Sequence, residues 1–206
     1  MDASRRLTAA ELTLVADRQL FAAKARITGK VTGWLKDVQS RLQADLRGKA
    51  LLTPPQFDLA KTQFVRGEHL EDHPYQYVDC PKHFADGNTL TIRTLFWWGH
   101  HAVIALLVEG EHVLQYKQNF LSRYHQVADH DLMLSLGPDL WEWKSGEGLT
   151  LPVTRDRRSE VAAVLGGRTL FKLTRYIPFD DPTIIEARLL DAASTTLQAF
   201  LPVIAL

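Results

Sequence analysis

The sequence predicts an α+β domain with a mostly antiparallel sheet, packed helices and a long amphipathic helix at its N-terminus. Three observations lead to this prediction: apolar residues at helical spacing before residue 48, an apolar hairpin pattern over residues 90–108, and short strand-like segments that alternate with helical ones. The chain has 206 residues, enough to bury a sizeable core. We therefore expect residues 1–206 to form one domain, with 1–48 as a helical arm and 49–206 as the body.

The first helix has a clear start. Residues 8–11 read Thr-Ala-Ala-Glu, which fits a capping box. Apolar residues then recur every three or four positions along one stripe of a helix: Leu20, Ala23, Ile27, Val31, Trp34, Val38 and Leu42. Gly29 and Gly33 predict a bend or a close packing contact, and Gly48 suits a C-terminal cap. The segment is one helix or two and ends near residue 47.

The next segment is polar. Residues 56–74 lack clear periodicity and predict a loop, whereas Tyr75 to Val78 predict a strand. Asp86-Gly87 is a turn signal. The sequence therefore predicts that the sheet begins at Tyr75.

Residues 90–98 and 101–108 are rich in β-branched and aromatic residues and flank Gly99-His100, which suits a two-residue hairpin turn. This turn predicts three opposite pairs on one face of the hairpin: Trp98 with His101, Phe96 with Val103, and Ile92 with Leu107. Trp97, Leu95 and Ile104 then line the other face. Because both faces are apolar, we expect a central hairpin that is covered on both sides, or covered on one side and grooved on the other.

Helical spacing returns after Gly110 and predicts a helix over residues 111–128, with a strand over 112–116 as the alternative. The remaining pattern predicts strands at Leu132–Leu136, Leu140–Trp143 and Leu149–Thr154, a helix at Arg157–Leu165, a strand at Leu170–Ile177 and a last helix that begins at Asp181-Pro182.

The charges are balanced in sum but not along the chain. There are 24 Lys and Arg residues and 24 Asp and Glu residues. Residues 1–50 nevertheless carry a net charge of +5 and the remaining residues −5. The balance argues against a generally basic nucleic-acid binder. The basic N-terminal helix is a candidate surface for packing against the acidic body, for homodimerisation or for an anionic partner.

Several function classes are disfavoured. No apolar run approaches the roughly 20 residues that span a bilayer, so we expect no membrane insertion. The single cysteine, Cys80, permits neither an intrachain disulfide nor a cysteine-based zinc cluster, which favours a cytoplasmic location. The nucleophile motif G-x-S-x-G and the glycine-rich phosphate loops do not occur. We therefore predict no cofactor, with a divalent metal as an alternative.

Three groups of residues are candidates for chemistry. His69, Asp72 and His73 are the richest local source of metal ligands, although a solvated polar loop explains them as well. His101, Glu109 and His112 are candidates for acid or base catalysis in a cleft, against the simpler role of structural residues. A third set is able to line a groove that stacks on a planar ligand, or to fill the core: Arg93, Trp97, Trp98, Tyr116, Trp141 and Trp143.

The stretch from Thr94 to Glu109, Thr-Leu-Phe-Trp-Trp-Gly-His-His-Ala-Val-Ile-Ala-Leu-Leu-Val-Glu, resembles the YktB-like family of uncharacterised bacterial cytoplasmic proteins. The order of a long N-terminal helix, a Trp/His-bearing hairpin and a C-terminal helix near Leu201-Pro202 is similar too. The resemblance covers most of the chain and implies a fold like the saddle-shaped TATA-binding-protein class. It implies no activity and carries over no functional residue.

The sequence thus predicts a binding or interaction module with a groove beside the 90–108 hairpin, for a small molecule or another protein. The alternative is a small metal-dependent or histidine-based hydrolase that uses residues 69–73 and His101.

Overall fold

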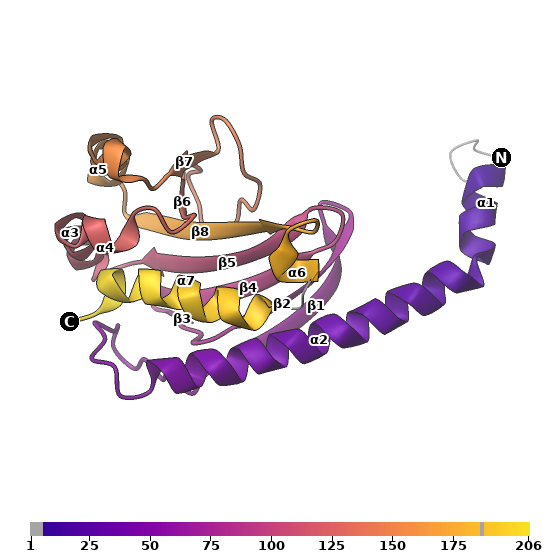
Figure 1. Ribbon diagram of the computed structural model, residues 1–206, viewed down its shortest axis with the longest axis horizontal. Helices are drawn as coiled ribbons and strands as arrows, with labels where there is room; N and C mark the ends of the chain where they lie inside the picture. The colour runs from indigo at the N-terminus through magenta and orange to yellow at the C-terminus, as the bar shows by residue number, and fades with distance from the viewer. Residues whose placement is uncertain (1–5, 186–187) are drawn as a thin grey trace. The chain divides into compact units, whose positions relative to one another are not determined.

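The computed structural model describes residues 6–185 and 188–206 and confirms the α+β fold with an antiparallel sheet (Figure 1). The chain divides into two compact units, Met1–Gly33 and Trp34–Leu206, and the division falls inside a helix. The second unit contains the whole sheet and the helices that pack on it.

Two helices form the N-terminal part, α1 (Ala9–Ala16) and α2 (Arg18–Leu46). The capping box is confirmed: the Glu11 amide donates to Thr8 Oγ1 at 3.2 Å and the Thr8 amide donates to Glu11 Oε2 at 2.6 Å. Asp17 separates the helices because its backbone is extended. Its Oδ1 accepts hydrogen bonds from the amides of Gln19 and Leu20, so Asp17 caps the second helix.

The structure tests one of the two roles predicted for the glycines of α2, the close packing contact. The helix continues through Gly29 and Gly33, and a Cβ added at either position would meet nothing within 4 Å. The close packing contact predicted there is therefore wrong. The helix ends at Leu46, next to Gly48 with its positive φ of 75°, as predicted.

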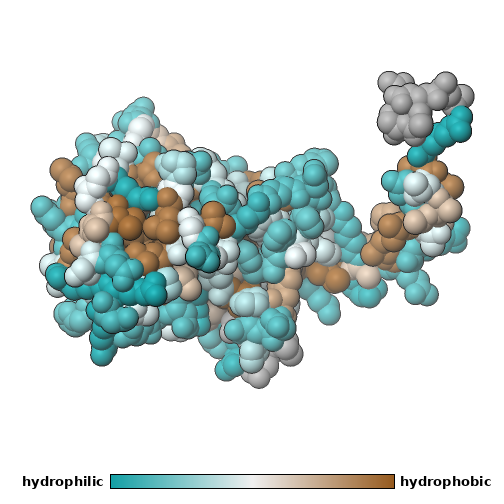
Figure 2. Space-filling model, turned by 90° about the horizontal axis from the view of Figure 1, so that it is seen from above, coloured by the Kyte–Doolittle hydropathy of each residue, from teal (hydrophilic) through white to brown (hydrophobic). Residues whose placement is uncertain are grey.

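The N-terminal unit has apolar side chains at its surface, visible in brown in Figure 2. They are Leu7, Leu12, Leu14, Val15, Leu20, Phe21 and Ile27. Homodimerisation through this helix stays a prediction. Among the residues described, no helix combines the length and the apolar composition needed to cross a bilayer.

The strands form one antiparallel sheet in the order β1-β2-β4-β5-β8-β6-β7, with β3 paired to β4. Their bounds are β1 Gln63–Leu70, β2 His73–Asp79, β3 Phe84–Ala85, β4 Asn88–Trp97, β5 His101–Glu109, β6 Met133–Ser135, β7 Thr150–Pro152 and β8 Leu170–Pro178. The loop predicted over residues 56–74 is wrong where β1 and the start of β2 lie. Since β1 is an edge strand with no buried side chain, it lacks the apolar alternation that marks a half-buried strand.

The hairpin of β4 and β5 exists, but its predicted register is wrong by one residue. Trp97, not Trp98, lies opposite His101, and three residues connect the strands, with Gly99 at a φ of 74°. A slip of one residue moves a side chain to the other face of a sheet. His101 therefore shares a face with Trp97 and Leu95 instead of with Trp98.

The three opposite pairs change with the register. Phe96 lies opposite Ala102 and Ile92 lies opposite Leu106, so the predicted partners of Phe96 and Ile92 are wrong. Both strands are nonetheless buried on both faces, as predicted.

Helices cover one face of the sheet. Figure 1 shows α7 (Leu189–Ile204) and the end of α2 on the same side, where Ser194 donates to Asp45 across the two helices. Residues 112–116 are not a strand, because α3 (Val113–Ser122) begins there. The other helical elements are α4 (Tyr124–Val127), the 3-10 turn η2 (Arg155–Arg157), α5 (Arg158–Gly166) and α6 (Pro182–Ile185).

Truncation of the helix layer at Phe200→Ala is expected to lower the free energy of unfolding by about 3–5 kcal/mol, because Phe200 is fully buried in α7 and leaves a cavity. The matched control Leu114→Ala removes a side chain that is 69% exposed and should change it by less than about 0.5 kcal/mol. Chemical denaturation of both variants measures the difference; equal stabilities would contradict the packing of α7.

Candidate functional site

The second face of the sheet is covered by a segment without regular structure. Residues 136–149, here named the strap, connect β6 to β7. The strand predicted at Leu140–Trp143 is wrong, since these residues have no strand partner and belong to the strap. Leu140 and Trp143 are buried against Leu95, Trp97 and the side chains of β5 on the same face.

Side chains of the sheet hold the strap through its backbone carbonyl groups. Arg168 donates to the carbonyls of Leu136 at 2.6 Å and Gly137 at 2.8 Å, just before β8. Within β8, Lys172 donates to the carbonyls of Leu140 and Glu142. The Tyr176 hydroxyl donates to the carbonyl of Lys144, and His101 Nε2 hydrogen-bonds the carbonyl of Trp143. Buried irregular backbone needs such partners, because an unpaired carbonyl is costly away from water.

Lys172 is a buried cation in this layer. Only 1% of its surface is exposed, and its Nζ lies 4.2 Å from the centre of the Trp143 ring. Burial lowers the pKa of Lys172 to about 8, and the charge of Arg93 acts in the same direction, whereas Glu142 and Asp139 oppose the shift.

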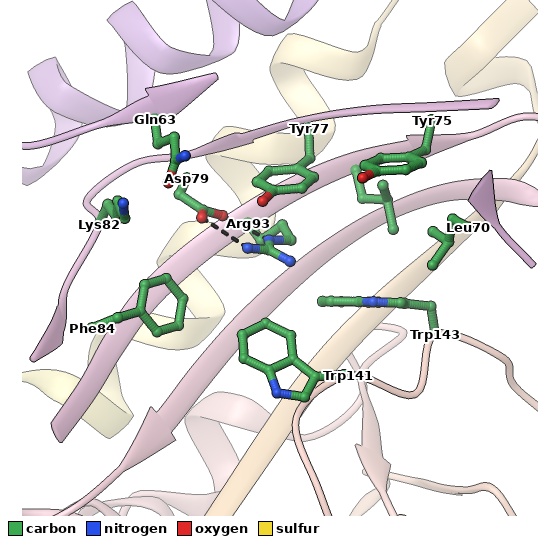
Figure 3. A pocket seen from close by; sticks show the side chains of 11 residues that line it. Gln63, Leu70, Tyr75, Tyr77, Asp79, Lys82, Phe84, Arg93, Trp141 and Trp143 are labelled. Atoms are coloured by element: carbon green, nitrogen blue, oxygen red, sulfur yellow. Dashed lines mark hydrogen bonds and ion pairs between the residues drawn. The ribbon is translucent and has the colours of Figure 1, made fainter. Parts of the chain in front are cut away.

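An aromatic cavity of about 440 Å³ lies between the strap and the strands β1, β2 and β4. This cavity is named the Arg93 pocket and is drawn in Figure 3. Its lining residues are Gln63, Leu70, Tyr75, Tyr77, Asp79, Lys82, Phe84, Arg93, Leu95, Trp141 and Trp143. Figure 3 shows the two tryptophans of the strap on one side, the two tyrosines of β2 on the other, and Arg93 between them. The volume is typical of pockets for small organic ligands.

The guanidinium of Arg93 is fixed in the middle of these rings. It binds Asp79 through two hydrogen bonds, Nε to Oδ1 at 2.7 Å and Nη2 to Oδ2 at 2.8 Å. Its Cζ lies 3.7 Å from the centre of the Tyr77 ring and 5.4 Å from those of Trp141 and Trp143. An arginine has five N–H donors, and Asp79 uses two of them. The other three N–H groups, two on Nη1 and one on Nη2, are not used by Asp79, and Arg93 lines the pocket.

Burial and charge shape the titration of the pocket walls. Burial raises the pKa of the Asp79 carboxyl, and the hydrogen bonds from Arg93 oppose the rise. Burial also raises the pKa of Tyr77, so its hydroxyl stays protonated at neutral pH. Lys82 adds a second cation to the wall, so two cations and one carboxylate give the lining a net charge of +1.

The pocket follows from the alternation of β2. Tyr75, Tyr77 and Asp79 are two residues apart and therefore project from the same face of the strand. Antiparallel pairing sets Tyr77 opposite Leu95 and Asp79 opposite Arg93 on β4. The sequence reasoning missed these three residues, although the pattern Tyr-x-Tyr-x-Asp carries the signal.

The structure gathers three of the six residues predicted to bind a ligand. Arg93, Trp141 and Trp143 line the Arg93 pocket. Trp97 lies next to it and lines a smaller hollow that shares both strap tryptophans. Trp98 and Tyr116 do not line either cavity. Trp98 contacts Phe96 on the face of the sheet opposite the Arg93 pocket, and the hydroxyl of Tyr116, in α3, donates to the carbonyl of Leu52.

The three residues predicted for acid or base catalysis do not come together. His101 and Glu109 lie at opposite ends of β5, eight residues and roughly 26 Å apart. Burial lowers the pKa of His101, and its Nε2 bonds the Trp143 carbonyl at 3.0 Å, so this imidazole holds the strap. His112 bonds the carbonyl of Thr53. His101, Glu109 and His112 therefore do not form one catalytic site.

The predicted metal ligands lie around the turn between β1 and β2. His69 is in β1, Asp72 is in the turn with a φ of 62°, and His73 Nδ1 lies 2.7 Å from the carbonyl oxygen of Glu71. Within residues 6–185 and 188–206, no three His, Cys, Asp or Glu side chains gather closely enough to hold a metal ion. The three residues therefore form no metal site in this structure.

Comparison with protein-family models, with curated proteins and with solved structures gives no match. The YktB-like resemblance and the fold that it implies therefore stay predictions.

The unfolding equilibrium is expected to depend on pH through Lys172. Its pKa is about 8 in the folded protein against an ordinary value of 10.5, so between these values the unfolded chain binds a proton that the folded chain does not. The free energy of unfolding therefore rises with pH in this window. Relative to the variant Lys172→Met, the native protein should gain about 2 kcal/mol between about pH 7 and pH 10.

Urea unfolding of both proteins at a series of pH values measures this gain. The raised pKa values of Cys80 and Tyr176, each about 12, lower the stability at alkaline pH, but both proteins share them. The difference between the two curves therefore isolates Lys172. Parallel curves would show that Lys172 does not titrate in this range.

Proposed function

We propose that this protein is a small-molecule-binding module and that the Arg93 pocket takes a planar organic anion, a flat aromatic ring that bears a carboxylate or a phosphate. One observation carries the proposal: a buried guanidinium stands among aromatic rings in a cavity of about 440 Å³, with its Nε and Nη2 edge fixed by Asp79. We assign the N–H groups on the other edge of the guanidinium to the ligand. A preorganised guanidinium favours carboxylate and phosphate, because its paired N–H groups match two oxygens.

The aromatic walls account for the planar part of the ligand. Trp141 is 51% exposed, although it stands beside Arg93 and lies 5.8 Å from the Phe84 ring. An exposed tryptophan at the mouth of a cavity is able to stack on a flat ring at little cost in conformational entropy. Lys82 adds positive charge to the opposite wall, which favours an anion over a neutral ring.

Loss of Trp141 should weaken binding of a planar anion. We expect 2-naphthoate to bind the native protein and Trp141→Ala to lower its affinity about tenfold, because one stacked ring contributes about 1–3 kcal/mol. Isothermal titration calorimetry measures both affinities. Trp98→Ala is the matched control, since Trp98 lies on the other face of the sheet, and its affinity should equal that of the native protein. An equal loss in both variants would contradict the proposed site.

The charge of the ligand should matter as much as its shape. The neutral compound 2-naphthamide has a ring of the same size as 2-naphthoate. We expect it to bind at least about tenfold more weakly, because its neutral amide forms weaker hydrogen bonds with Arg93 than a carboxylate does. Lys82→Ala should reduce this preference, and Lys36→Ala, which removes an exposed lysine from α2, should leave it unchanged. Equal affinities for the two compounds, or no binding of either, would overturn the proposal.

A further inference from the structure

A second hollow lies beside the Arg93 pocket. This hollow, named the acidic recess, has a volume of about 200 Å³ and is lined by Leu70, Glu71, Trp97, Asp139, Trp141, Glu142 and Trp143. Three residues line both cavities: Leu70, Trp141 and Trp143. The two hollows therefore share part of their walls, and both tryptophans of the strap belong to that shared part.

The two hollows differ in charge. In the Arg93 pocket, the cations Arg93 and Lys82 outnumber the one carboxylate. The recess instead carries three carboxylates, those of Glu71, Asp139 and Glu142. Two lysines face them: Lys144 Nζ lies 2.8 Å from Glu71, and buried Lys172 lies behind the Trp143 ring. The carboxylates still outnumber the lysines, so the recess is net negative.

The strand β2 gives the direction from one hollow to the other. Leu70, which lines both cavities, pairs with His73 at the start of β2, whereas Asp79 ends that strand. Tyr75 and Asp79 both line the Arg93 pocket and are four residues apart, which corresponds to about 13 Å. The recess therefore lies toward the start of β2, and Arg93 and Lys82 lie toward its end.

The recess suits an organic cation better than a metal ion. Its carboxylates do not converge as metal ligands do, in the part of the chain that the structure describes. An ammonium group needs no such convergence, because it is attracted both by nearby carboxylates and by the faces of tryptophan rings. Trp141 and Trp143 supply these rings at the junction of the two cavities.

From this arrangement we infer that the ligand is dipolar: a planar ring with an anionic group held at Arg93 and Lys82 and an ammonium group held in the acidic recess. This inference rests on the proposed function of the Arg93 pocket and adds the second charge and its position. A ligand that has only the anionic group would make no contact with the carboxylates of the acidic recess.

Two compounds test it, 6-(aminomethyl)-2-naphthoate and 6-methyl-2-naphthoate, which differ by one ammonium group. Calorimetry on the full chain should show the aminomethyl compound binding at least about fivefold more tightly, and added salt should reduce this advantage. The double variant Asp139→Asn/Glu142→Gln should abolish it. Amide oxygens keep the bonds that Asp139 accepts from the Trp141 amide and Glu142 from the Lys144 amide, so the strap retains its turns.

Glu147→Gln is the matched control, because Glu147 is an exposed carboxylate of the strap that lines neither cavity; the advantage should persist in it. If both naphthoates bind the native protein equally, the dipolar ligand is overturned while the Arg93 pocket stands. If neither binds, the proposed function fails and this inference fails with it. An equal loss in Glu147→Gln and the double variant would assign the effect to general charge and overturn the recess.

Discussion

Hydrogen bonds from side chains in and next to the sheet to the carbonyl groups of the strap hold together the face on which the Arg93 pocket lies. The constraint arises from β4 and β5, whose side chains are buried on both faces of the sheet, so that both faces need a covering layer. Helices cover one face and satisfy their own backbone. The strap covers the other without regular structure, so its carbonyls need donors from outside, and Arg168, Lys172 and Tyr176 supply them.

Some of these donors are charged although they are buried between the sheet and the strap. Aromatic rings next to them stabilise the charge. Lys172 lies on the Trp143 ring, while Arg93 lies within 5.4 Å of the same ring and binds Asp79. The negative face of an aromatic ring attracts a cation, so rings partly replace the water that the cations have lost. The tryptophans of the strap therefore have two roles: they bury the sheet, and they form the wall of a cavity that contains a guanidinium.

The periodic parts of the molecule could be predicted from sequence. The helical stripe that includes Val38 and Leu42 and the capping box at Thr8 identify helices, because side chains of a helix repeat on one face. The central hairpin could be predicted from its composition but not its register, since Gly99-His100 fits a two-residue turn while the chain uses three. That difference of one residue assigns His101 to the wrong face.

The strap and the edge strand show why the site was only partly predictable. Leu140 to Trp143 are rich in apolar and aromatic residues, as strands are, yet no strand pairs with them, and pairing is a property of tertiary structure. The edge strand β1 gives no apolar signal because none of its side chains is fully buried. Composition alone marked Arg93 and the strap tryptophans, whereas Tyr77 and Asp79 join the site only through the pairing of β2 with β4.

The site and the strap are electrostatically linked. The charge of Arg93 contributes to the lowered pKa of Lys172, and Lys172 holds the strap that supplies Trp141 and Trp143. An anion beside Arg93 offsets that repulsion and favours the protonated lysine, which retains all three of its N–H donors. Because linkage is reciprocal, a protonated Lys172 in turn favours the anion. Under the proposed function, the charges that hold the strap in place therefore also favour binding of the anion.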